Sequence, residues 1–137
     1  MNAQEIKTLI NNWVNAKIQF EQYNDKLKEL AKEILNFVNT NYRNLLSDFA
    51  QGYQIHLNKI KVDNNNLYIT YTDSWTDYPE YATLVIPLDE VWHYEKYFEK
   101  LYDDYLKDQA EKERMKNEFL EREEYETYMR LKQKFEK

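Results

Sequence analysis

The sequence predicts an α+β protein that is mostly helical, with a three-stranded antiparallel meander between long helices. Two observations predict this class. Apolar residues in the first forty positions recur at steps of three and four, the period of an amphipathic helix. From Tyr53 the period falls to two, which is typical of strands, and helical spacing returns after Pro87.

A long amphipathic helix is expected over residues 3–40, because its apolar positions follow a heptad pattern without glycine or proline. At the usual rise per residue it would be about 55 Å long. The positions of this heptad stripe are Ile6, Leu9, Trp13, Ala16, Phe20, Tyr23, Leu27, Leu30, Ile34 and Phe37. We expect the stripe to pack against residues 91–106, or against a second copy, with one sheet face covering part of it.

After Phe37 the pattern slips, which predicts a break around Asn39–Asn41. A short helix should follow and end near Gly52, because this glycine stands where a helix C-cap is needed. The chain has no other glycine, so a Walker loop or a dinucleotide-binding fingerprint is excluded.

The three strands are expected on either side of two turns. The polar tetrad DNNN at residues 63–66 suits a hairpin turn between the first two strands. In the first strand the apolar residues change phase at Asn58–Lys59, which predicts a β-bulge there. The third strand, YATLVI, is bracketed by Pro79 and Pro87, as suits strand ends.

Helical spacing from about Leu88 predicts charged C-terminal helices. Between residues 107 and 114 Ala110 is the sole apolar residue, so this stretch is expected to be a solvated helix or a joint. We therefore expect a single α+β domain over 1–108, with a helical core and a small sheet. Residues 109–137 would form a charged helical extension.

The composition argues against catalysis, so we expect a protein that is not an enzyme and needs no cofactor. The chain has no cysteine, which excludes disulfides, thiolate nucleophiles and cysteine-ligated metals. Asp89 and His93 have a metal-ligand spacing but lack a third ligand, so no metal site is expected. Direct nucleic-acid binding is disfavoured because there are few arginines and no basic stripe.

The net charge of −6 is concentrated between Asp73 and Asp108, where ten carboxylates face three lysines. Large rings are interleaved with these carboxylates. One interpretation is structural: the rings are core residues, and acids near a helix start favour the helix dipole. The other is a partner-binding face, with these expected contacts: Asp73, Trp75, Asp77, Tyr78, Glu80, Glu99, Asp103 and Asp104.

The order LYITYTDSW, an aromatic loop, YATLVIPLDEVW and a charged helix ending in YMRLKQKFEK resembles small uncharacterised accessory proteins of tailed bacteriophages. The resemblance covers roughly the C-terminal half and includes no catalytic motif. It implies a phage or prophage protein acting in a bacterial cytoplasm. Many such proteins inhibit host defence, including anti-CRISPR proteins, some of which are acidic mimics of DNA.

Two functions stay open at this level. The first is a non-enzymatic, phage-encoded inhibitor that binds a basic host or defence protein through the acidic segment 73–108. The second is a coiled-coil structural or assembly protein that forms a homo-oligomer, such as a homodimer, through the N-terminal helix. No apolar run reaches the ~20 residues that span a bilayer, so we expect no membrane association. The resemblance to phage proteins implies a location in the bacterial cytoplasm.

Overall fold

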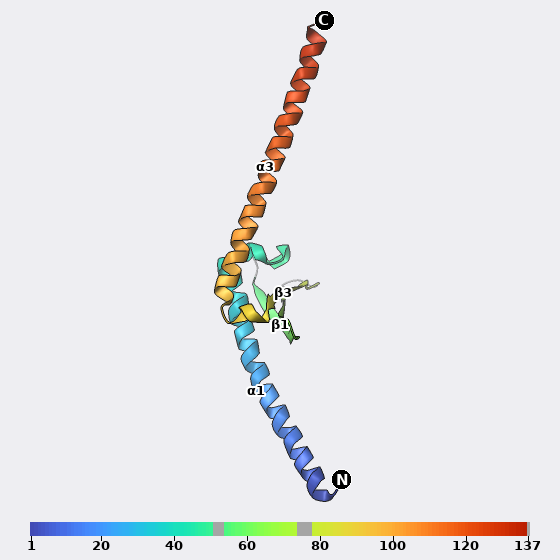
Figure 1. The fold of residues 1–137 in the computed structure, drawn as a ribbon, viewed down its shortest axis with the longest axis vertical. Helices are drawn as coiled ribbons and strands as arrows, with labels where there is room; N and C mark the ends of the chain where they lie inside the picture. The colour runs from blue at the N-terminus through green and yellow to red at the C-terminus, as the bar shows by residue number, and fades with distance from the viewer. Residues whose placement is uncertain (51–53, 74–77, 137) are drawn as a thin grey trace. The chain divides into compact units, whose positions relative to one another are not determined.

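The computed structural model describes residues 1–50, 54–73 and 78–136 (Figure 1). It confirms an α+β protein that is mostly helical, with a long N-terminal helix and a three-stranded antiparallel sheet. The chain divides into two compact units, Met1–Phe98 and Glu99–Lys137. The elements are α1 (Ala3–Asn41), η1 (Arg43–Leu45), η2 (Asp48–Ala50), β1 (Ile55–Val62), β2 (Asn66–Asp73), β3 (Tyr81–Pro87), α2 (Leu88–Val91) and α3 (Tyr94–Phe135).

Helix α1 begins at a capping box. The Asn2 side chain accepts a hydrogen bond from the Glu5 backbone N–H at 2.8 Å, and the Glu5 carboxylate accepts one from the Asn2 N–H at 3.3 Å. These bonds satisfy amide groups that have no partner within the helix. At the other end the Tyr42 N–H donates to the Val38 carbonyl, and Tyr42 leaves helical geometry. The break expected around Asn39–Asn41 is therefore confirmed.

The expected short helix before Gly52 takes a different form. Two 3₁₀ helices, η1 and η2, stand in its place, and Gly52 itself lies outside the described residues. Leu46 between them has an extended backbone, and the Ser47 N–H donates to the Tyr71 hydroxyl at 2.9 Å instead of to a helical carbonyl. A bond to the sheet thus interrupts the helical ladder at this point.

The sheet has the order β1-β2-β3, as the meander predicts. Asp63 forms the expected hairpin turn, where its Oδ1 accepts from the N–H groups of Asn65 and Asn66, both at 2.8 Å. The register between β1 and β2 shifts between Leu57 and Lys59, which confirms the bulge. Because of this extra residue, Leu57 and Ile60 lie on the same face of the sheet.

The core of the first unit lies between that face and the C-terminal half of α1, beside which Figure 1 shows the sheet. Alternate residues of β2 are buried, and Leu84 and Ile86, the β3 neighbours of Ile69 and Leu67, are buried with them. The most deeply buried large side chains are Phe98, Ile34, Leu67, Ile69, Ile86 and Val38. Burial of their apolar surface is the main stabilising term of this unit.

The helical region after Pro87 consists of two helices, in agreement with the charged C-terminal helices expected from about Leu88. Helix α2 ends at Val91, and α3 begins at Tyr94. Between them the His93 N–H donates to the Glu90 carbonyl, a tighter bond than that of an α-helix. The His93 ring pairs with the Glu90 carboxylate and lies edge-on to Trp92.

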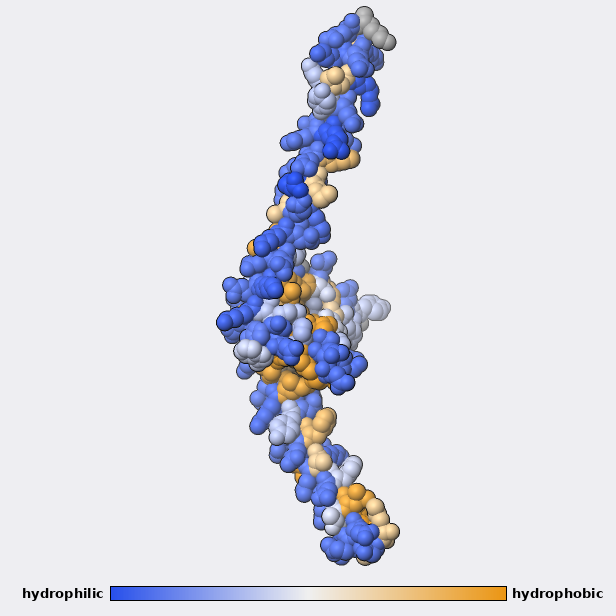
Figure 2. Space-filling model, viewed as in Figure 1, coloured by the Kyte–Doolittle hydropathy of each residue, from blue (hydrophilic) through white to orange (hydrophobic). Residues whose placement is uncertain are grey.

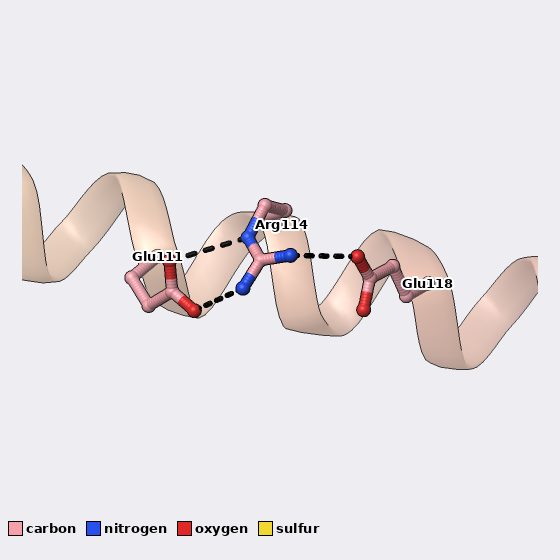
Figure 3. A network of polar contacts seen from close by, with 3 residues as sticks. All are labelled: Glu111, Arg114 and Glu118. Carbon is pink, nitrogen blue, oxygen red and sulfur yellow. Dashed lines mark hydrogen bonds and ion pairs between the residues drawn. The ribbon is translucent and has the colours of Figure 1, made fainter.

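In the second unit α3 continues without a break from Glu99 to Phe135. The stretch 107–114 is therefore a solvated helix and not a joint. Arg114 bridges two carboxylates on its exposed face, Glu111 one turn before it and Glu118 one turn after it (Figure 3). The domain boundary predicted after residue 108 stays a prediction.

No helix among the described residues is long and apolar enough to cross a membrane.

Candidate interaction site

Asp73, the first of the expected contact residues, lies at the end of β2 on the inner face of the sheet. Only 7% of the surface of this residue is exposed to solvent. The carboxylate Oδ1 accepts a hydrogen bond from the Glu80 N–H at 3.0 Å. Asp73 therefore holds together the two ends of the β2–β3 connection and offers little surface to a partner.

The β2–β3 connection carries four more of the expected contacts. Trp75 and Asp77 lie outside the described residues. Tyr78 is 87% exposed, and Glu80 is exposed as well. The Glu80 carbonyl accepts a hydrogen bond from the Thr72 hydroxyl at 2.8 Å, so its backbone is fixed while its carboxylate is free to meet solvent.

Glu99, Asp103 and Asp104 belong to the second unit, on the N-terminal part of its helix. All three are exposed, and no ion pair joins them within the described part of the chain. Glu99 and Asp103 are four residues apart and so lie on one face of α3. The structure thus brings Asp73 and Glu80 together in one unit and the three helical acids together in the other.

The rings of segment 73–108 fall into two groups. Tyr94 packs edge-on against Phe37 of α1 at a centroid distance of 5.6 Å, and Phe98 is buried. Burial raises the pKa of the Tyr94 and Tyr97 hydroxyls, and neighbouring carboxylates add to the effect. Phe98 is a core residue, as the structural interpretation expects, and Tyr94 and Tyr97 are half-buried, whereas Trp92 is 81% exposed.

A regular exposed apolar surface of the first unit is the N-terminal half of the heptad stripe. We call Ile6, Leu9, Trp13, Ala16, Phe20 and Tyr23 the N-terminal stripe. Its five large members are 44–70% exposed, whereas Ile34 on the same line of α1 is fully buried. Figure 2 shows this hydrophobic surface as patches along the part of α1 that bears the N-terminus. The sheet therefore covers one half of α1 and leaves the other half open.

Length is the signal that identifies this surface from sequence. A strand of eight residues spans about 27 Å, whereas the 39 residues of α1 span nearly 60 Å. A three-stranded meander lying along this helix is too short to cover the whole stripe. The heptad pattern predicts the helix and its stripe, while the expected partner contacts of the acidic segment lie elsewhere in the chain.

A hollow of about 410 Å³ lies where the N-terminal stripe meets the sheet. It opens between α1 and the hairpin end of β1, the strand at one edge of the sheet. Its lining is mostly apolar and includes Phe20, Tyr23, Leu27, Ile60 and Val62. The exposed stripe therefore ends in a recess that is shaped to receive an apolar side chain.

Among residues 1–50, 54–73 and 78–136, no group of three or more His, Asp or Glu side chains is placed to hold a metal ion. His93 contacts Glu90 and not Asp89, the residue with the metal-ligand spacing in the sequence.

No protein-family model, curated protein or solved structure matches this chain.

Proposed function

We propose that this chain is a non-enzymatic assembly protein that associates with further copies of itself through the N-terminal stripe of α1. The observation that supports this is the contrast along one helix. The heptad stripe is buried by the sheet at Ile34 and is open at Trp13, Phe20 and Tyr23. Exposed apolar surface of this extent and regular spacing marks an association site.

The rings of the stripe also have the chemistry of a protein contact. Tyr and Trp bring large, rigid contact area into interfaces at low entropic cost, and they dominate binding energy where they are buried at the centre. Polar residues such as Asn12 and Gln19 flank the stripe, as expected of the rim of an interface.

Light scattering after gel filtration, over a wide range of protein concentration, tests this proposal. The native chain should become an oligomer as concentration rises. Phe20→Glu should remain a monomer, because association would bury its charge. The matched control is Ile18→Glu, which places the same charge on the opposite side of the same exposed helix and should leave association intact. A native chain that stays monomeric throughout contradicts the proposal.

A second candidate function rests on the exposed acids of the second unit. Glu99, Asp103 and Asp104 present carboxylates that no described ion pair neutralises. Such a face attracts a basic partner, and a phage-encoded inhibitor of a nucleic-acid-handling or defence protein would use it as a decoy for phosphate.

Competition with nucleic acid tests the decoy function. A bacterial protein captured by the tagged chain should be displaced by duplex DNA and by salt. Changing Glu99, Asp103 and Asp104 to Lys should abolish capture with helicity unchanged. Changing Glu113, Glu121 and Glu126 of the same helix to Lys is the matched control and should retain it. Capture that is indifferent to DNA, or equal in both variants, rejects this function.

A further inference from the structure

We infer that two copies of the chain pair antiparallel through the N-terminal stripe, with the end of each helix seated at the hollow of the other copy. The inference rests on the proposed self-association and adds its direction and register. In this arrangement Ile6 lies opposite Tyr23 of the second copy, Leu9 opposite its Phe20, and Trp13 opposite its Ala16. A two-fold axis between Val14 and Asn15 makes each contact occur twice.

The position of the sheet excludes the parallel alternative. Beyond Leu27 the same line of α1 is covered by the chain's own sheet, with Ile34 and Val38 fully buried beneath it. In a parallel pair both sheets would lie at the same height between the two helices and force them apart. In an antiparallel pair the sheets lie at opposite ends, and the stripes can meet over their full length.

Side-chain size along the stripe favours the antiparallel register. The small Ala16 faces the large Trp13 of the second copy, and the other rings of the stripe face aliphatic side chains. No two rings of the stripe therefore compete for the same layer, as close packing requires. A parallel pair in register would place Trp13 against Trp13 and Ala16 against Ala16. The first layer would be overfilled and the second would contain a void, and both are destabilising.

Charge at the edge of the stripe favours the same register. Glu5 and Lys26 are both exposed and occupy equivalent flanking positions of the heptad. In the antiparallel pair Glu5 of each copy lies beside Lys26 of the other, which gives two ion pairs. In a parallel pair Glu5 lies beside Ile10, and no opposite charges meet along the stripe.

The hollow is the place where the N-terminal end of the second copy's helix would bind. The antiparallel register carries the first turn of the second helix past Tyr23 and onto the recess bounded by Leu27, Ile60 and Val62. Ile6 of the second copy is the apolar side chain that reaches this recess. The partly exposed Val62 and the rings of Phe20 and Tyr23 are covered by the same step.

The area is adequate for a specific dimer. Trp13, Phe20 and Tyr23, each roughly two thirds exposed, together offer on the order of 400 Å² per copy. That is about half of the ~800 Å² per partner found in standard interfaces. The exposed side chains of Ile6, Leu9 and Ile10 supply further apolar area on the same side of the helix.

The absence of cysteine from the chain makes a disulfide test direct. Ile6→Cys and Tyr23→Cys variants, which differ in mass, are mixed in equal amounts and oxidised gently. The inference expects the mixed 6–23 dimer as the dominant product. Each variant oxidised alone should stay uncrosslinked, because the two copies of residue 6 would be about 25 Å apart along the helix axis. Asn11→Cys, on the outer face of the same helix, is the control for random collision.

The outcomes separate this inference from the proposed function. Predominant 6–6 and 23–23 products, in a chain that still associates, would reject the antiparallel register and leave self-association standing. A monomeric native chain that forms no crosslink beyond the Asn11→Cys control would reject both.

A charge reversal gives an independent check. Lys26→Glu should weaken association by placing two carboxylates side by side, whereas Lys28→Glu, the same change on the outer face of the exposed helix, should leave association intact. Equal association of the two variants, with helix content unchanged, would also contradict the antiparallel register.

Discussion

Asp73 shows how one buried carboxylate closes a loop. Its oxygen satisfies the Glu80 N–H at 3.0 Å in a place with little access to water. The bond is partly buried, and a hydrogen bond to a charged group contributes about 1–3 kcal/mol to stability. The residue was expected to meet a partner, and its burial assigns it a structural task that sequence spacing does not reveal.

Asp73→Ala should therefore lower the free energy of unfolding by about 1–3 kcal/mol. Urea denaturation followed by tryptophan fluorescence measures the change. Asp104→Ala, which removes an exposed carboxylate, is the control and should remain within about 0.5 kcal/mol of the native chain. Equal midpoints for the two variants would show that the loop does not depend on this bond.

Asp63 makes stability depend on pH. Hydrogen bonds from the backbone of Asn65 and Asn66, and from the Tyr68 hydroxyl, lower the pKa of this carboxyl in the folded chain. A lowered folded pKa stabilises the fold above the unfolded pKa, and this contribution is lost as pH falls through the folded pKa.

In acid urea titrations, the stability of the native chain should fall more steeply below about pH 4 than that of Asp63→Asn. The difference between the two proteins should be largest near neutral pH and shrink in acid. Tyr81→Phe, which alters an exposed ring at the edge of the sheet, should follow the native curve. Parallel curves for the native chain and Asp63→Asn would contradict the role of the turn.

At the scale of elements, periodicity predicted most of the fold. The heptad pattern predicted α1 almost to its last residue, and the change of phase in the first strand predicted the bulge. These features follow from alternation along the chain, which any single sequence displays. The two 3₁₀ helices did not follow from it, because the bond from Ser47 to Tyr71 joins residues far apart in sequence.

The candidate site was harder to predict than the fold, because it too depends on contacts between residues far apart in sequence. A heptad stripe has the same sequence pattern whether it is buried or exposed. The length of the sheet that packs against it determines which part is buried. The rings after Trp92 show the converse: Phe98 is a core residue, and Tyr94 packs against Phe37, although their sequence neighbours are acidic. Burial depends on tertiary neighbours that spacing alone does not identify.

The ion-pair bridge on α3 is an element-scale device that salt should weaken. Arg114 lowers the pKa of Glu111, first through its hydrogen bond and then through its charge, and Glu118 completes the bridge. Exposed ion pairs at this spacing support a helix by small amounts that are screened in salt.

Arg114→Gln should therefore speed amide hydrogen exchange around residues 111–118 at low salt and have little effect at high salt. Arg130→Gln on the same helix is the control, because no described ion pair holds Arg130. The same increase in exchange at low and high salt would show that the bridge does not act through charge.

At the scale of the whole molecule, association and folding should be linked. If copies bind through α1 only when it is folded, mass action stabilises the folded state more as concentration rises. The melting temperature of the native chain should therefore increase with protein concentration, as measured by circular dichroism.

Phe20→Glu should remove this dependence, and Ile18→Glu should keep it, since only the first lies on the N-terminal stripe. A melting temperature that is constant with concentration in the native chain would show that folding does not draw on a second copy.

At the bulge in β1, the number of residues is constrained, whereas the type of residue at position 58 is not. Asn58 is exposed and lies opposite no residue of β2, so many side chains would serve in its place. Its removal would turn Ile55 and Leu57 to the outer face, because a shift of one residue reverses a strand. Descendants of this sequence should therefore differ in residue type at position 58 while keeping the number of residues between Leu57 and Ile60. An alignment of such descendants should therefore show substitutions at position 58 and no deletion.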